Sequence, residues 1–207
     1  DHSTSPLRDI PGLVVGCPSR GDDAATMLRT LAALAKVDGR VTAFLEPIAL
    51  YMTKDLYEAG DGQWQFPYPA PGEAMPLGEG RVYNEGHDDL VIFTFGNGVP
   101  MSLRAAKRIE AERGWKVRVV DLRWLVPLND AFIAAQAAKA KRIIVVNEGR
   151  KSAGVGEGVI TAIVEGGHGA TPLHRVVGAD TFTPLAGAAF LVLPGDDDIV
   201  AAAAKLA

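Results

Sequence analysis

His2 is the first side chain of this sequence that could move a proton, and Asp1 and Ser3 flank it. An imidazole beside a carboxylate and a hydroxyl suggests nucleophilic catalysis, but the members of a catalytic triad meet in space and not in sequence order. From residue types alone, His2 is typical of a solvated chain end. Cys17 follows an apolar run, so we expect a small buried hydrophobe and not a nucleophile.

The counts of cysteine and histidine limit the other chemistry. Because Cys17 is the single cysteine, the chain cannot form an internal disulfide, and a zinc site built on cysteine is not expected. The remaining histidines are too scattered to indicate a metal site: His87, His168 and His174.

Gly60-Asp61-Gly62, with Asn84 downstream, resembles the diphosphate–magnesium motif of thiamin enzymes. In that motif the chain leaves a buried strand and opens a helix, so that Asp and Asn oxygens converge on the metal. Here Pro67, Pro69 and Pro71 follow closely. We therefore interpret Gly60-Asp61-Gly62 as part of a linker and not as a metal site.

A second glycine-rich segment runs from Gly154 to Gly158 and is expected to open a helix. Backbone N–H groups at such a place could hold a phosphate. The spacing is not that of a dinucleotide-binding fingerprint, and close packing of a helix on a sheet explains the glycines equally well.

The first part of the chain predicts a strand over residues 13–17, a helix over 21–35 and a strand over 41–47. Ser19 is a plausible helix cap. This βαβ unit implies a parallel sheet, and two strands with one helix cannot cover that sheet on both faces. We therefore expect residue 1 to lie inside a domain whose remainder comes from an upstream segment or a partner chain.

Residues 52–80 are rich in proline and glycine and carry Trp64, Phe66 and Tyr68, which predicts a stiff linker lying against a surface. After it, strands alternate with helices. We predict strands over 90–95, 116–122, 142–147 and 173–178, and helices over 99–113, 131–139, 156–165 and 196–206. The fold class is α/β: a partial parallel βαβ unit followed by a doubly wound, mostly parallel domain.

The composition is that of an ordinary globular protein, with 48% hydrophobic and 22% charged residues among 207. The net charge of −4 leaves no electrostatic footprint for nucleic acid. No apolar run is long enough to span a membrane, and the N-terminus lacks the features of a signal peptide. We expect a cytoplasmic protein.

Several segments together resemble the β subunits of thiamin diphosphate-dependent 2-oxo acid dehydrogenases, which form part of the decarboxylating component. In chain order they are residues 2–6, 10–15 and 18–19, then 44–47 with 50–51, 76–78, 120–128, 145–148, 154–157, and 178–181 with Pro184. The most recognisable of these is Val120-Asp121-Leu122-Arg123-Trp124-Leu125-Val126-Pro127-Leu128. Each motif is weak alone, whereas their shared order covers essentially the whole chain.

The resemblance implies three parts. Residues 1–51 would be the rear of a pyrimidine-binding domain, 52–80 a linker, and 81–207 a transketolase-like C-terminal domain. The intact enzyme would use thiamin diphosphate and magnesium, but the cofactor-activating glutamate and the diphosphate motif belong to segments absent from this sequence. We therefore expect no cofactor bound to this chain alone and assign it no cofactor-binding residue.

The resemblance also changes the reading of His2, which matches a histidine near the thiazolium that assists acyl transfer. An imidazole suits proton transfer near neutral pH. Leu7-Arg8 departs from the family, which commonly has an acidic or amide side chain after the Ser-Pro. Asp38 matches a position that helps to bind a monovalent cation in some members.

The expected partners are an α subunit, or the N-terminal part of the same chain, and the lipoyl acyltransferase component, within a homodimer or heterotetramer. Two other functions stay open. The chain could be a non-catalytic module for dimerisation and acyltransferase docking, or the tail of a transketolase or deoxyxylulose-phosphate synthase.

Overall fold

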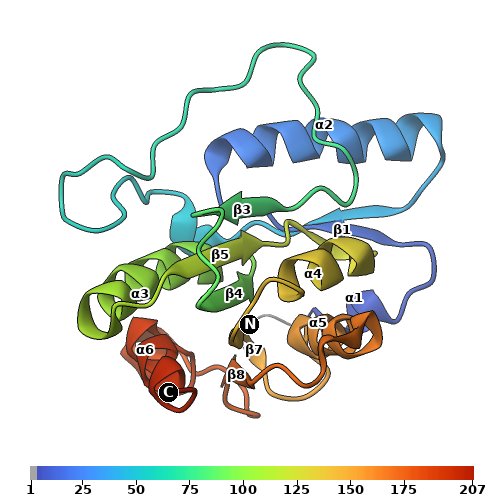
Figure 1. The fold of residues 1–207 in the computed structure, drawn as a ribbon. Helices are drawn as coiled ribbons and strands as arrows, with labels where there is room; N and C mark the ends of the chain where they lie inside the picture. The colour runs from blue at the N-terminus through green and yellow to red at the C-terminus, as the bar shows by residue number, and fades with distance from the viewer. Residues whose placement is uncertain (1–3) are drawn as a thin grey trace.

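The computed structural model describes residues 4–207, which form two β-sheets and their covering helices (Figure 1). One sheet has the strand order β2-β1-β6 and the other the order β3-β5-β4-β7-β8. The strands are β1 (Val14–Gly16), β2 (Thr42–Phe44), β3 (Arg81–Tyr83), β4 (Leu90–Thr94), β5 (Val117–Asp121), β6 (Trp124–Val126), β7 (Ile143–Arg150) and β8 (Leu173–Gly178). The helices are α1 (Ser5–Arg8), α2 (Gly21–Val37), α3 (Gly98–Arg113), α4 (Asp130–Ala137), α5 (Val155–Ile163) and α6 (Asp196–Ala204).

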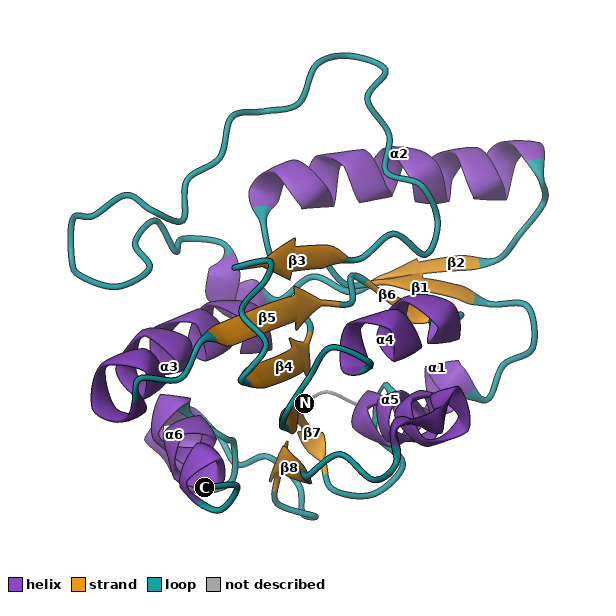
Figure 2. Cartoon of the chain, in the orientation of Figure 1, coloured by secondary structure: helices purple, strands orange, loops and turns teal. Residues whose placement is uncertain are grey.

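The five-stranded sheet forms the doubly wound domain. β4, β5, β7 and β8 run parallel, and β3 adds an antiparallel edge next to β5. α3 and α6 lie on one face, and α4 and α5 on the other (Figure 2). Because both faces are covered, every residue of β4 and β5 is buried, which explains their continuous apolar runs. The predicted α/β class is confirmed.

The three-stranded sheet takes its third strand from the second half of the chain. β1 and β2 are parallel, as predicted, but β6 pairs with β1 in the antiparallel direction. α2 covers one face, where Met27 and Leu31 pack against Val14 and Trp124. The expectation that only an upstream segment or a partner chain would complete this sheet was therefore wrong for β6, which comes from the same chain.

The start of α2 corrects one prediction. Arg20, and not Ser19, is the N-cap residue, and no side chain caps the helix. The Ser19 hydroxyl instead donates a hydrogen bond to the buried carboxylate of Asp121. A carboxylate is the stronger acceptor in a dry environment, so it holds the hydroxyl that would otherwise cap the helix.

Residues 52–80 contain no helix or strand, yet they pack against the rest of the molecule. Arg29 on α2 donates to the backbone carbonyl oxygens of Ala70 and Glu73 at 2.7 and 2.8 Å. Trp64 is buried, whereas Tyr68 is 80% exposed. The linker therefore lies against α2 as expected, though not through all three aromatics, and the domain boundaries at 51 and 80 stay predictions.

Within residues 4–207, no helix is both long and apolar enough to cross a membrane.

Candidate functional site at the carboxyl ends of the strands

Strand ends from both sheets surround one crevice of about 400 Å³. Cys17 follows β1, Glu46 follows β2, Asn97 comes after β4, and Glu148 lies near the end of β7. Ligands of open α/β sheets bind in such crevices at the carboxyl ends of strands. The lining residues are Thr4, Cys17, Leu45, Glu46, Pro47, Ile48, Ala49, Asn97, Glu148, Thr183 and Leu193.

Two carboxylates face this crevice, each held by a neutral donor. The Asn97 Nδ2 atom donates to Glu148 Oε2 at 2.8 Å, and the Tyr51 hydroxyl donates to Glu46 Oε2 at 2.6 Å. Glu148 is half-buried and Glu46 is exposed. Among the residues that the structure describes, no lysine or arginine lines the crevice, so its walls carry negative charge.

Cys17 lies on the crevice wall with no solvent exposure. Burial raises the pKa of its thiol, and the negative charges of Asp121 and Glu148 raise it further. The thiol therefore stays protonated at neutral pH, which makes it a poor nucleophile and confirms the prediction of a small buried hydrophobe.

His2, the predicted catalytic residue, lies outside the described residues. Thr4 is the first residue that the structure places, and it is buried in the crevice wall with 4% exposure.

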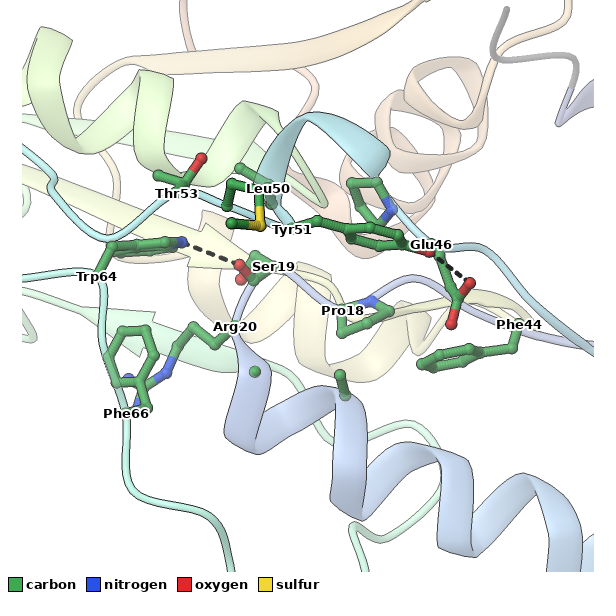
Figure 3. Close-up of a pocket in the computed structure, with 14 residues that line it drawn as sticks. Pro18, Ser19, Arg20, Phe44, Glu46, Leu50, Tyr51, Thr53, Trp64 and Phe66 are labelled. Atoms are coloured by element: carbon green, nitrogen blue, oxygen red, sulfur yellow. Dashed lines mark hydrogen bonds between the residues drawn. The ribbon is translucent and has the colours of Figure 1, made fainter.

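A larger cavity of about 540 Å³ adjoins the crevice and shares Glu46 and Pro47 with it (Figure 3). Trp64 and Phe66 form one wall, and the Trp64 indole N–H donates to the Ser19 carbonyl oxygen at 3.2 Å. The Arg20 guanidinium stacks over the Phe66 ring at 3.7 Å. The linker thus builds part of this cavity.

A buried ionic network joins α2 to the β3–β5 edge of the five-stranded sheet. Asp23 on α2 accepts hydrogen bonds from Arg123 at 2.8 and 3.0 Å and from Arg81 at 2.8 Å. Asp121, at the end of β5, accepts from Ser19 and from the backbone N–H of Arg123. Burial raises the pKa of Asp121 to about 6, and the charge of Asp23 adds to that rise. The recognisable segment over residues 120–128 therefore joins α2 to the five-stranded sheet through Arg123.

The remaining motifs have structural roles. The Asp61 carboxylate accepts four backbone N–H groups, from Leu56, Tyr57, Glu58 and Gln63. These bonds lower its pKa and consume the oxygens that a metal would need. Asn84 donates its amide to the Val117 carbonyl oxygen.

The glycines from Gly154 to Gly158 allow close packing. A Cβ on Gly154 would clash with Asn147, and one on Gly158 would clash with Arg8. The Arg8 guanidinium donates to the Gly154 carbonyl oxygen at 2.9 Å. This contact favours packing over phosphate binding for the segment.

Asp38 is exposed at the C-cap of α2, and its role in cation binding stays a prediction.

From the sequence, Asp23 was expected only to complement the helix dipole, Glu148 only belonged to a segment of the family resemblance, and Asn97 had no role. A signal existed for the last two, because each follows or ends a predicted strand of a parallel sheet. No comparable signal existed for Asp23, since first-turn acids commonly serve only the helix dipole.

The described residues do not fit a diphosphate–magnesium site. The Asp61 oxygens are occupied, the crevice walls are negative, and residues 4–207 hold no group of three or more metal-ligating side chains. A diphosphate needs positive charge or a bound cation beside it.

Comparison with known families and structures gives one consistent result. Residues 78–195 match the family described as "Transketolase, C-terminal domain". The pyruvate dehydrogenase E1 component subunit beta of Staphylococcus aureus is 31% identical over 202 residues, covering 97% of this chain and 57% of that protein. The mitochondrial subunit beta-1 of Arabidopsis thaliana is 33% identical over 205 residues, covering 95% of this chain and 51% of that protein.

A solved structure described as "Split gene transketolase, inactive beta4 tetramer" has the same fold. It superposes with a TM-score of 0.71 at 23% identity and covers 98% of this chain and 59% of the other. The chain thus spans little more than half the length of the proteins it matches.

Proposed function

Because this chain belongs to the transketolase C-terminal domain family, we propose that it is the C-terminal section of a 2-oxo acid dehydrogenase decarboxylating component. The observation that carries the proposal is the similarity to pyruvate dehydrogenase β subunits along 97% of the chain. The crevice adds support, since it lies where parallel sheets bind ligands and Thr4 brings the chain to its wall.

In the intact enzyme, thiamin diphosphate with magnesium would supply the decarboxylating chemistry. The partners would be an α subunit, or an N-terminal part of the same chain, and a lipoyl acyltransferase within a multienzyme complex. A dimer or heterotetramer in the cytoplasm is the arrangement we infer. His2 would serve as the proton-transfer group of acyl transfer to the lipoyl ring.

The test uses the assembled enzyme with the His2→Ala substitution. We expect acylation of free lipoamide to fall at least tenfold, while decarboxylation measured with a dye acceptor falls much less. Equal losses in both assays, or no loss, would remove His2 from this role. Turnover of a ketose phosphate in place of a 2-oxo acid would favour the transketolase alternative.

A separate experiment concerns the chain by itself. Since the described residues do not fit the diphosphate, we expect calorimetry with thiamin diphosphate and Mg²⁺ to give no binding at micromolar concentration. Micromolar affinity would contradict the assignment of the cofactor site to other segments.

Docking of a partner is the second candidate function. It is favoured by Phe182, Leu185, Phe190 and Leu191, which are 82–91% exposed between β8 and α6. A variant with Phe182 and Leu185 replaced by Ser should weaken partner assembly without changing the fold, as seen by sedimentation and circular dichroism.

A further inference from the structure

We propose that the aromatic cavity shown in Figure 3 binds a small organic cation, namely an ammonium group carried on an aromatic or aliphatic body. In this assignment Glu46 takes the charge, and Trp64 and Phe66 contact the body. The proposal rests on the described residues around the cavity and does not depend on the function proposed above.

The first step of the argument is that the linker wall of the cavity is already held in place. The backbone N–H of Trp64 donates to the Lys54 carbonyl oxygen at 2.8 Å, and its indole N–H donates to the Ser19 carbonyl oxygen at 3.2 Å. The rings of Trp64 and Phe66 meet edge to face with their centroids 5.3 Å apart. The preceding turn is fixed by the four N–H groups that Asp61 accepts. A ligand therefore meets a formed wall, and binding costs little ordering of the chain.

The second step is size and lining. The cavity of about 540 Å³ lies within the range of small-molecule binding sites. Apolar side chains predominate in its lining, and Phe44, Leu50 and Met52 belong to it together with the two linker aromatics. Burial of an apolar ligand body against such walls is favourable because it removes apolar surface from water.

The third step is charge. Within the described part of the chain, Arg20 and Glu46 are the charged residues that line the cavity. The Arg20 guanidinium is neutralised, since its Nε and Nη2 atoms donate to the Asp22 carboxylate at 2.9 and 2.7 Å. Glu46 accepts a hydrogen bond from the neutral Tyr51 hydroxyl, and no cation among residues 4–207 forms an ion pair with it. The charge left without a counter-ion is therefore negative, which selects a cationic ligand over an anionic one.

The fourth step places the two ends of the ligand. Figure 3 shows Glu46 at one end of the cavity and Trp64 and Phe66 at the other. Tyr51, which donates to Glu46, adds an aromatic ring near the bound ammonium group. Both Glu46 and Tyr51 are exposed, so the charged group keeps part of its hydration while the apolar body enters the cavity.

The experiment titrates the ¹⁵N-labelled full 207-residue chain at neutral pH with three probes that share a phenyl body: 2-phenylethylamine, 2-phenylethanol and 3-phenylpropionate. NMR follows the indole N–H signal of Trp64, assigned through Trp64→Phe. We expect the amine to bind at least about tenfold more tightly than the alcohol, and the carboxylate to bind most weakly. The isosteric Glu46→Gln should remove most of the advantage of the amine and leave the affinity for the alcohol unchanged. Glu165→Gln, on an exposed side chain outside the cavity, is the control and should leave all three affinities unchanged.

A second variant tests the location of the site. Ala24→Leu fills the cavity from α2, so it should weaken binding of the amine and the alcohol together while the circular dichroism spectrum stays native. Tighter binding of 3-phenylpropionate than of the amine, equal affinity for all three probes, or an amine affinity unchanged in Glu46→Gln would overturn the proposal. The same holds if the amine gives no saturable binding up to about 10 mM.

Discussion

The two sheets differ in how completely their strands are buried. The five-stranded sheet is covered by helices on both faces, and all residues of its central strand β4 are buried. In the three-stranded sheet β1 is equally buried, but every residue of its outer strand β2 is only half-buried. Val15 of β1, and Cys17 directly after it, belong to the same core as Phe93.

The three-stranded sheet is therefore stabilised by its contacts with the second half of the chain. It receives β6 across an antiparallel pairing and an ionic network centred on Asp23 and Arg123. The network residues Asp23, Arg81 and Arg123 line a separate cavity beside α2. The crevice lies between these two parts, so it depends on the contacts that join them, and four experiments test that dependence.

The largest effect is expected from Arg123→Ala. Arg123 and Asp23 each have side chains that are 3% exposed, and the change leaves the Asp23 carboxylate buried with Arg81 as its one ion-pair partner among residues 4–207. Breaking a buried pair costs about 3–5 kcal/mol of unfolding free energy, to be measured by urea denaturation. The exposed pair of Arg108 with Asp197 provides the control, since Arg108→Ala should cost far less than Arg123→Ala. Equal losses in the two variants would show that the pair of Asp23 with Arg123 stabilises the fold no more than an exposed ion pair does.

Truncation of one phenylalanine in each sheet compares the two cores directly. Phe93 on β4 has no exposure, so Phe93→Ala should cost about 3–5 kcal/mol. Phe44 on β2 is only partly buried, so Phe44→Ala should cost roughly half as much. The comparison, again by urea denaturation, would fail if the β2 substitution proved the more harmful one.

Acid should raise the free energy of unfolding through protonation of the buried Asp121. Its pKa is raised to about 6 from an ordinary value of 3.8, so the folded chain binds this proton more tightly than the unfolded chain does. The contribution to stability is complete below pH 3.8 and is lost as the pH rises through 6. The stability of the wild type relative to Asp121→Asn should therefore fall by about 2.4 kcal/mol between pH 4 and 7. If the stability difference between wild type and Asp121→Asn stayed constant across this range, the pKa of Asp121 would not be raised in the folded chain.

The smallest global effect is expected in the linker. Asp61→Asn weakens the acceptor of four backbone N–H groups within a surface loop. Hydrogen exchange of the Leu56, Tyr57, Glu58 and Gln63 amides should accelerate while the unfolding midpoint barely moves. A large drop in that midpoint would mean that the linker, through the cavity wall formed by Trp64 and Phe66, stabilises the whole fold.

Periodicity and turn residues were enough to predict most of the secondary structure. The fourth strand, predicted over 173–178, matches β8, and the helix predicted over 99–113 matches α3 within one residue. β3 was missed because its three residues stand between Gly80 and Asn84 with no apolar run around them, and β6 because it follows β5 after only two residues. The order of weak motifs indicated the family, since order along a chain is itself sequence information.

The sequence by itself determined the α/β class, the alternation of the second domain and the structural reading of Gly60-Asp61-Gly62. Only the tertiary structure decided that β6 completes the first sheet, that Ser19 serves Asp121 and not a helix cap, and that Glu148 and Asn97 meet beside Cys17. Local propensity acts over a few residues and leaves its mark in the sequence. Asn97 and Glu148 lie 51 residues apart and meet because β4 and β7 are neighbours in the sheet. Such a contact leaves no local pattern in the sequence.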